Sequence, residues 1–139
     1  MIQADHEIKI KTRGPGLYEI TGEIAAWLSN RKVMNGLLTV YCPHTSASLV
    51  IQENADPDVQ RDLASFFARI APKDSALYRH ATEGPDDMPA HIRAALTQTS
   101  ISIPISGGRM RLGTWQGIYL FEHRDGPMPR TVQLHVIGE

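Results

Sequence analysis

Alternating apolar and polar residues predict β-strands near both ends of the chain. Ile8 and Ile10 alternate with charged residues, and a turn signal follows at Gly14-Pro15-Gly16. The mostly apolar stretch 37–42 is typical of a buried strand, and Pro43 marks its end. In the C-terminal third we predict strands over 100–106, 110–112, 115–123 and 131–137, with a hairpin turn at Gly107-Gly108.

Three segments show helical spacing instead. Apolar residues from Ile20 to Leu28 recur on one helical face, and 87–97 predicts a helix with Ile92, Ala95 and Leu96 inward. Between them, Asp56 can cap a helix and Pro57 suits its first turn. The apolar stripe of this predicted helix is Val59, Leu63, Phe66, Phe67 and Ile70. The order of elements lacks regular βαβ alternation. It therefore predicts one α+β domain over 1–139, with a mainly antiparallel sheet packed against about three helices.

Size, charge and cysteine content exclude several classes of protein. A chain of 139 residues is expected to form one domain, and its net charge of −1 without runs of like charge argues against a nucleic-acid partner. The sequence contains no stretch of 18 apolar residues, so no membrane span is predicted. Residues 1–14 lack the apolar core of a signal peptide. The single cysteine, Cys42, fits a reducing compartment. We expect a cytoplasmic protein.

Polar residues interrupt the pattern first at 43–54, between a predicted strand and a predicted helix. Strand ends and helix starts are common places for ligands to meet polar groups. The same residue types also make turns and helix caps, so that structural reading stays open for them. The candidate site residues in this segment are His44, Thr45, Ser48 and Glu53.

A second polar segment, 83–92, places Asp87 and His91 four residues apart on a predicted helix. At this spacing the two side chains share a face, and the carboxylate can fix the tautomer of the imidazole. The alternative is that Asp87 caps the helix and His91 is a solvated surface residue. His80 lies in the loop before this segment.

The most unusual segment is 107–124, where a predicted strand leads through GTWQG to Glu122-His123-Arg124. Glycines permit close backbone approach, and Gln116 adds an amide. In a regular strand Glu122 and Arg124 point to one face and His123 to the other, so at least one ionisable group meets apolar surroundings. That is costly unless the group is paired, ligated or placed at a cleft. A Glu122–Arg124 pair at the sheet rim is the structural alternative.

Metal binding is a further hypothesis. Four histidines, His44, His80, His91 and His123, lie in or beside the polar segments, whereas His6 and His135 fit plain strand patterns. No HExxH or CxxC spacing is present, so a metal site requires the fold to bring distant segments together. No nucleophile elbow or P-loop is present either. Phosphate can still be held by Arg109, Arg111 or Arg124 together with backbone amides at helix starts.

Three motifs, PHTSASLVIQEN, EGPDDMPAHI and GRMRLGTWQGIYLFEHR, occur in order and together resemble the YjbQ-type family of small conserved proteins. The resemblance covers essentially the whole chain. It implies an α+β fold, a homotrimer with pockets at or near subunit contacts, and a weak secondary thiamine-phosphate synthase activity. The family's motif histidines fall on His44, His80, His91 and His123, and its polar partners on Thr45, Ser48, Glu53, Asp87, Gln116, Glu122 and Arg124.

The synthase reaction joins a pyrimidine diphosphate to a thiazole phosphate and releases pyrophosphate, which needs Mg²⁺ and cationic groups. In that hypothesis Glu122 or Asp87 holds metal and His44 or His91 moves protons. A second hypothesis is a hydrolase with histidine-bound Zn²⁺. A third is a non-catalytic protein that binds a small phosphorylated or acidic metabolite. No organic cofactor is predicted.

Overall fold

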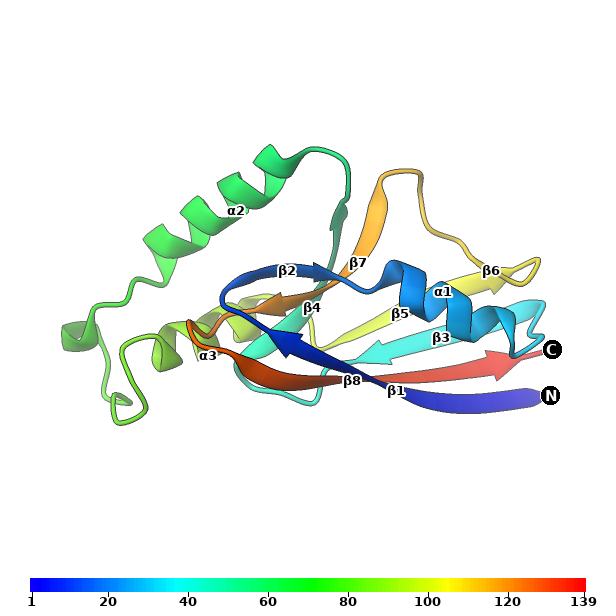
Figure 1. Cartoon of the computed structure of the whole chain (residues 1–139), viewed down its shortest axis with the longest axis horizontal. Coiled ribbons are helices and arrows are strands. Elements are labelled where there is room, and N and C mark those ends of the chain that lie inside the picture. Colours follow the sequence, from blue (N-terminus) through cyan, green and yellow to red (C-terminus); the bar gives the residue numbers. More distant parts are fainter.

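The computed structural model describes residues 1–139 and contains two antiparallel sheets and three α-helices (Figure 1). The larger sheet has the strand order β1 (Ile2–Thr12), β8 (Met128–Gly138), β3 (Asn35–Tyr41), β5 (Ser100–Ser106) and β6 (Arg109–Met110). The smaller sheet has the order β2 (Gly16–Glu19), β7 (Gln116–Glu122) and β4 (Ala47–Glu53). The helices are α1 (Thr21–Ser29), α2 (Pro57–Ile70) and α3 (Asp87–Leu96), with a 3₁₀ turn, η1, at Ser75–Leu77. The predicted α+β class is confirmed.

Both sheets contribute to one hydrophobic core. In β5, Ile101, Ile103 and Ile105 are buried while the intervening residues are exposed, as the sequence pattern predicts. The same cluster contains side chains from the other strands and from α1, among them Leu38, Leu49, Leu120, Leu134 and Ile24. The small sheet also contacts the segment that leads into β5, because Leu49 of β4 and Gln98 exchange both N–H···O bonds, at 2.6 and 3.2 Å. The chain therefore folds as a single domain.

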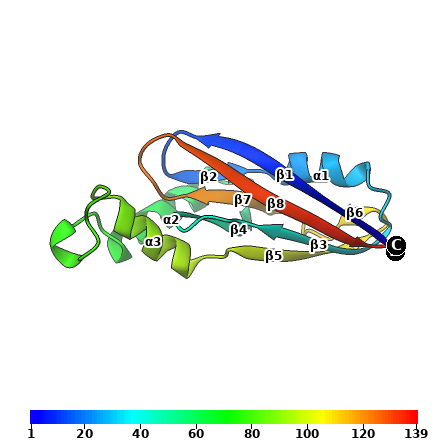
Figure 2. The same ribbon diagram turned by 90° about the horizontal axis from the view of Figure 1, so that it is seen from below.

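The molecule is elongated, and its two ends differ. α2 and α3 lie at one end of the long axis, while β6 and both termini lie at the other (Figures 1 and 2). The pairing of Ile2 with Gly138 holds the termini side by side. Polar residues on α3 are consequently far from those in the β5–β6 hairpin.

Two strands were not expected from the sequence pattern. Residues 43–54 were interpreted as a polar segment, but Ala47–Glu53 form β4, which pairs with β7 along its whole length. The serines and glutamine in this segment hide the apolar signal of Leu49, Val50 and Ile51. β2 is only four residues long and begins at Gly16, whose φ of 146° suits glycine.

The inner faces of two helices differ from the prediction. α2 begins as expected, with the Asp56 side chain accepting a hydrogen bond from the Asp58 N–H at 2.9 Å, but only Phe67 of its apolar stripe is buried. On α3 the buried residues are Asp87, Pro89, Ala90 and Ala94, and Leu96 is exposed. Small alanines allow α3 to approach β4 closely, so the helix turns that face inward.

None of the helices combines the length and the apolar content that a membrane crossing requires.

Candidate functional site

His80, Asp87 and His91 converge at the end of the molecule that holds α3. One ligand atom from each lies within 4.8 Å of the other two. His80 Nε2 is 2.7 Å from Asp87 Oδ2, and His91 Nε2 is 3.2 Å from the same oxygen. The loop after η1 supplies His80, while the first two turns of α3 supply the others. The i, i+4 pair predicted from the sequence is thus joined by a third side chain.

The protonation of His91 follows from its second contact. His91 Nδ1 lies 2.8 Å from the backbone carbonyl oxygen of Thr45, which can only accept, so Nδ1 carries a proton. In the neutral ring, Nε2 is then a bare lone pair that faces a carboxylate oxygen. Two acceptors at 3.2 Å repel each other unless a proton or a metal ion lies between them. A carbonyl that orients a histidine in this way is also the usual outer support of a metal ligand.

Asp87 is buried and remains charged. Burial alone raises a carboxyl pKa, but the hydrogen bond from His80 and the charges of His91 and Arg124 outweigh it and hold the pKa of Asp87 below its ordinary value. Arg124 Nη1 lies 3.0 Å from Asp87 Oδ1, the oxygen that the histidines do not contact. Asp87 therefore offers Oδ2 to the centre and Oδ1 to Arg124. It does not cap α3, since the capping position is Asp86.

Arg124 is fixed by its neighbours rather than free to hold a ligand. Its Nε donates to Asp86 Oδ2 at 2.9 Å, and its Nη2 donates to the Glu83 carbonyl at 3.1 Å. The proposed Glu122–Arg124 pair does not form between side chains, because only the Arg124 backbone N–H reaches Glu122, at 3.1 Å. β7 ends at Glu122, so the strand alternation that suggested this pair does not extend to Arg124.

Glu122 instead pairs with Arg130, and both side chains are buried. Arg130 Nε and Nη2 donate to the two carboxylate oxygens at 2.7 and 2.6 Å, and Thr12 Oγ1 donates at 2.6 Å. Burial alone raises the pKa of Glu122, but these hydrogen bonds outweigh burial and lower it below its ordinary value. Arg130 Nη2 also donates to Ser46 Oγ at 3.0 Å. This cluster joins β1, β7 and β8.

His44 lies beside that ion pair and not in the His80–Asp87–His91 group. Its Nε2 accepts a hydrogen bond from the Thr131 backbone N–H at 2.9 Å, so this nitrogen is not free for a metal ion. Burial and the charge of Arg130 lower the pKa of His44. The neutral ring therefore fits this position. Of the four histidines predicted to bind metal, the structure brings together only His80 and His91.

His123 is the most enclosed histidine, and it begins a chain of hydrogen bonds. His123 Nε2 is 2.9 Å from Ser48 Oγ, which is 2.5 Å from Thr97 Oγ1, and Thr97 Oγ1 donates to the Arg93 carbonyl at 2.8 Å. Because the Thr97 proton goes to that carbonyl, Ser48 donates to Thr97 and accepts from His123. His123 is thus protonated on Nε2, and its buried Nδ1 is an acceptor without a partner. Burial lowers the pKa of His123 to about 3.

Other predicted site residues lie far from the α3 end. Glu53 and Gln116 face each other in the β4–β7 register, six residues from the pair formed by Ala47 and Glu122. That spacing corresponds to about 20 Å along a strand. Arg109 and Arg111 are exposed in and beside β6, at the opposite end of the molecule from α3 (Figure 1). Within one chain, these four residues do not join His80, Asp87 and His91.

Arg130 is the main residue that sequence reasoning missed. It lies just before the predicted strand 131–137, in a stretch that was interpreted as ordinary strand and loop. One signal was present: Arg130 is the only lysine or arginine between residues 125 and 139. A buried carboxylate at Glu122 needs a cation. Arg124 is nearer to Glu122 along the chain but stands beside Asp125, whereas Arg130 has no acidic residue next to it.

Comparison with known proteins agrees with this fold and these motifs. The family model described as "UPF0047 protein YjbQ-like" matches residues 6–139. A UPF0047 protein of Synechocystis sp. is 58% identical over 130 residues, which cover 94% of this chain and 88% of the relative. The YjbQ protein of Salmonella typhimurium is 43% identical, with 95% of this chain and 96% of the relative covered.

Solved structures give the same result. A crystal structure of a conserved yjbq/upf0047 family protein of Clostridium acetobutylicum superimposes with a TM-score of 0.87 at 38% identity, covering 95% of this chain and 99% of that one. A YbjQ-like protein of Sulfolobus solfataricus, at 18% identity and a TM-score of 0.85, shares the fold. The match of sequence and fold over nearly the whole chain shows that this protein belongs to the UPF0047/YjbQ family.

Proposed function

We propose that this protein is a divalent-metal-dependent enzyme with its centre at His80, Asp87 and His91. The observation that carries the proposal is the position of His91 Nε2, which the bond from Nδ1 to the Thr45 carbonyl turns toward Asp87 Oδ2 and which in the neutral ring is a lone pair. A cation placed among the three side chains converts two opposed acceptors into two ligands. Two imidazoles and one carboxylate are a common ligand set for Zn²⁺ in hydrolases and for other divalent metals.

The surroundings favour catalysis over a purely structural metal site. The side chain of His80 is 47% exposed and that of His91 is 29% exposed, so the three protein ligands leave a side open to solvent. A divalent cation with an open position supplies an activated water or polarises a phosphoryl or carboxyl oxygen. Asp87 keeps its negative charge, and Arg124 fixes its orientation. The substrate class that suits such a centre is a small phosphorylated or acidic metabolite.

Thiamine-phosphate synthase activity is proposed only as a weak secondary reaction of the same centre. Its support is the resemblance of the three sequence motifs to the family. The arrangement of cations does not favour it, because Arg109 and Arg111 lie at the other end of the molecule and all three donor groups of Arg124 are engaged. Hydrolysis needs fewer cationic contacts, so we place it first. The third candidate, a binding protein without turnover, is an outcome of the experiment below.

The test is metal content followed by turnover. Protein prepared without a histidine tag or chelator is expected to contain or take up one divalent ion per chain, measured by mass spectrometry of the metals. Asp87→Asn and His91→Gln should lose that ion, while His135→Gln, an exposed strand residue, should keep it. Metal-loaded protein is then assayed for hydrolysis of phosphate monoesters and for formation of thiamine phosphate.

Each outcome decides between the candidates. Hydrolysis that disappears in both ligand variants supports the proposal. Thiamine phosphate formation alone, lost in the same variants, makes the synthase the primary activity. Bound metal without turnover of either substrate supports the third candidate, a binding protein without catalytic activity. Failure to bind Zn²⁺, Mn²⁺, Fe²⁺ or Mg²⁺ at all contradicts the metal centre.

Assembly and compartment are parts of the same proposal. We propose a homotrimer, as the family resemblance implies, and the exposed apolar side chains of Phe66, Ile70, Leu96 and Trp115 support self-association. Light scattering after size-exclusion chromatography tests it, with three chain masses expected. We propose a cytoplasmic location, which the unpaired, buried Cys42 supports; burial raises the pKa of this thiol to about 11.

A further inference from the structure

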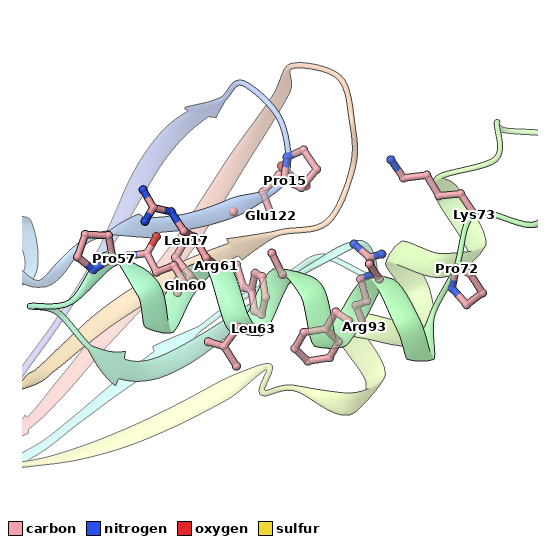
Figure 3. A pocket seen from close by; sticks show the side chains of 15 residues that line it. Pro15, Leu17, Pro57, Gln60, Arg61, Leu63, Pro72, Lys73, Arg93 and Glu122 are labelled. Atoms are coloured by element: carbon pink, nitrogen blue, oxygen red, sulfur yellow. The ribbon is translucent and has the colours of Figure 1, made fainter.

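A second hollow lies between α2 and the small sheet, apart from His80, Asp87 and His91. We call it the α2 pocket. Its volume is about 690 Å³, and side chains from β2, α2, α3 and the end of β7 surround it (Figure 3). Leu63, Phe67 and Phe121 form its apolar surface, and Phe67 and Phe121 meet edge to face with ring centres 5.5 Å apart. The cations Arg61, Lys73 and Arg93 line it as well.

The three cations differ in whether their charge is balanced. Arg61 pairs with Asp58 at 2.8 Å, and Lys73 pairs with Asp125 at 2.7 Å. Arg93 forms no ion pair with any carboxylate of the chain. Its Nη2 donates to the Ala71 carbonyl at 3.0 Å, and its buried Nε has no partner. A half-buried guanidinium without a counter-ion is costly, so the pocket is prepared for a negative charge.

The acidic groups near the pocket do not cancel this charge. Glu122 lines it, but its carboxylate already accepts from Arg130, Thr12 and the backbone N–H groups of 123 and 124. Asp125 faces Arg93 at longer range, and Lys73 holds it through both oxygens. Tyr78 also faces Arg93, and its hydroxyl donates to the Pro72 carbonyl at 2.8 Å. The uncompensated charge in the pocket is therefore that of Arg93.

We propose that the α2 pocket binds a small organic anion, with its phosphonate, phosphate or carboxylate group on Arg93 and its apolar body against Leu63, Phe67 and Phe121. An arginine guanidinium has the geometry for such oxyanions, and the aromatic rings give the body a dry surface. The inference does not depend on the metal centre, because no residue of His80, Asp87 and His91 lines this pocket.

Isothermal titration of the full chain, treated with EDTA and dialysed, tests the proposal with phenylphosphonate, which is not a phosphate ester and so is not a substrate for the proposed hydrolysis. One phenylphosphonate per chain is expected to bind. Inorganic phosphate, which lacks the body, and benzyl alcohol, which lacks the charge, should bind at least tenfold more weakly. Benzoate, titrated in parallel, shows whether the pocket favours a phosphonate or a carboxylate; binding of either supports the proposal.

The variants separate this pocket from other sites. Arg93→Gln should weaken phenylphosphonate binding at least tenfold, and Arg93→Lys should restore part of it. Arg69→Gln, at an exposed cation of α2 that does not line the pocket, should leave the affinity within twofold. Asp87→Asn should also bind normally, since it alters only the metal centre. Circular dichroism verifies that each variant is folded.

Three results overturn the proposal. One is the absence of binding by phenylphosphonate and benzoate at millimolar concentration. Another is unchanged affinity in folded Arg93→Gln protein, or in folded Arg93→Ala protein where Arg93→Gln does not fold. The third is loss of binding in Asp87→Asn, which assigns the anion to the metal centre. If Arg93→Gln changes the molecular mass in solution but not the affinity, the pocket is a contact between copies of the chain, and the proposal fails as well.

Discussion

Glu122 and Arg130 form a two-pronged ion pair inside the protein, at 0% and 4% side-chain exposure. Glu122 ends β7 of the small sheet, and Arg130 lies on β8 of the large sheet, so the pair connects the two sheets. Thr12 of β1 and Ser46 before β4 complete its hydrogen bonds. A buried pair of this kind is stable as a unit, but neither charge is tolerated alone.

Arg130→Met should therefore destabilise the protein strongly. It leaves the Glu122 carboxylate buried without its cation, and the expected loss is about 3–5 kcal/mol in the free energy of unfolding. Combining Arg130→Met with Glu122→Leu should recover a large part of that loss, because the double variant has no unpaired charge. Urea denaturation at one fixed protein concentration measures both. Arg61→Met, at an exposed pair with Asp58, is the control and should cost less than about 1 kcal/mol. Additive losses in the double variant would contradict this account.

His123 should make stability depend on pH above the range where carboxylates titrate. Its pKa falls from 6.5 in the unfolded chain to about 3 in the folded protein, so only the unfolded chain gains the proton as the pH drops. The contribution of His123 to the free energy of unfolding is thus fully present above pH 6.5. It decreases below that pH by up to about 1.4 kcal/mol per pH unit. His44, whose pKa is also lowered, adds to the same trend.

The measurement is urea denaturation between pH 4.5, the ordinary pKa of Glu122, and pH 6.5. His123→Gln keeps a donor for Ser48 but does not titrate, so its stability should fall less steeply with decreasing pH than that of the wild type. His135→Gln, on the exposed side of β8, should keep the full slope. Equal slopes in His123→Gln and wild-type protein would show that His123 is not held neutral.

The hydrogen bonds from His123 through Ser48 to Thr97 should have a fixed direction. Thr97→Val removes the acceptor for Ser48 and the donor to the Arg93 carbonyl, so we expect a loss of about 1–3 kcal/mol in the free energy of unfolding. Thr97→Ser keeps the hydroxyl and should be close to neutral. The ¹⁵N shifts of His123 provide an independent check, because they should show a proton on Nε2 and none on Nδ1. A proton on Nδ1 would reverse the assigned direction.

Local patterns in the sequence predicted local features well. The alternation at Ile101, Ile103 and Ile105 predicted a half-buried strand, and Asp56 caps α2 as expected. The i, i+4 spacing of Asp87 and His91 predicted their contact, because helix geometry alone fixes it. These features depend on neighbours within one element.

Features that depend on distant segments could not be predicted. The sequence does not show that His80 joins Asp87 while His44 and His123 point elsewhere, since loops and β8 decide this. Arg130 pairs with Glu122 only because β8 passes beside the end of β7. The apolar stripe of α2 predicted a buried face, yet only Phe67 of it is buried, because helical periodicity does not identify the surface that covers a helix.

Arg124 should act as a positioning residue for the proposed metal centre. It binds Asp87 Oδ1 at 3.0 Å and so leaves Oδ2 directed at His80 and His91. Residues that support a metal ligand in this way typically contribute 10–100-fold to affinity. We therefore expect Arg124→Gln to weaken Zn²⁺ binding by about 10–100-fold, measured by competition with a chromophoric chelator, and Arg124→Lys to recover part of the loss. Lys73→Gln, at an exposed pair with Asp125, is the matched control and should bind Zn²⁺ as the wild type does. If Arg124→Gln lowers thermal stability while Zn²⁺ affinity stays unchanged, Arg124 only connects α3 to the loop after β7, and Asp87 keeps its orientation without it.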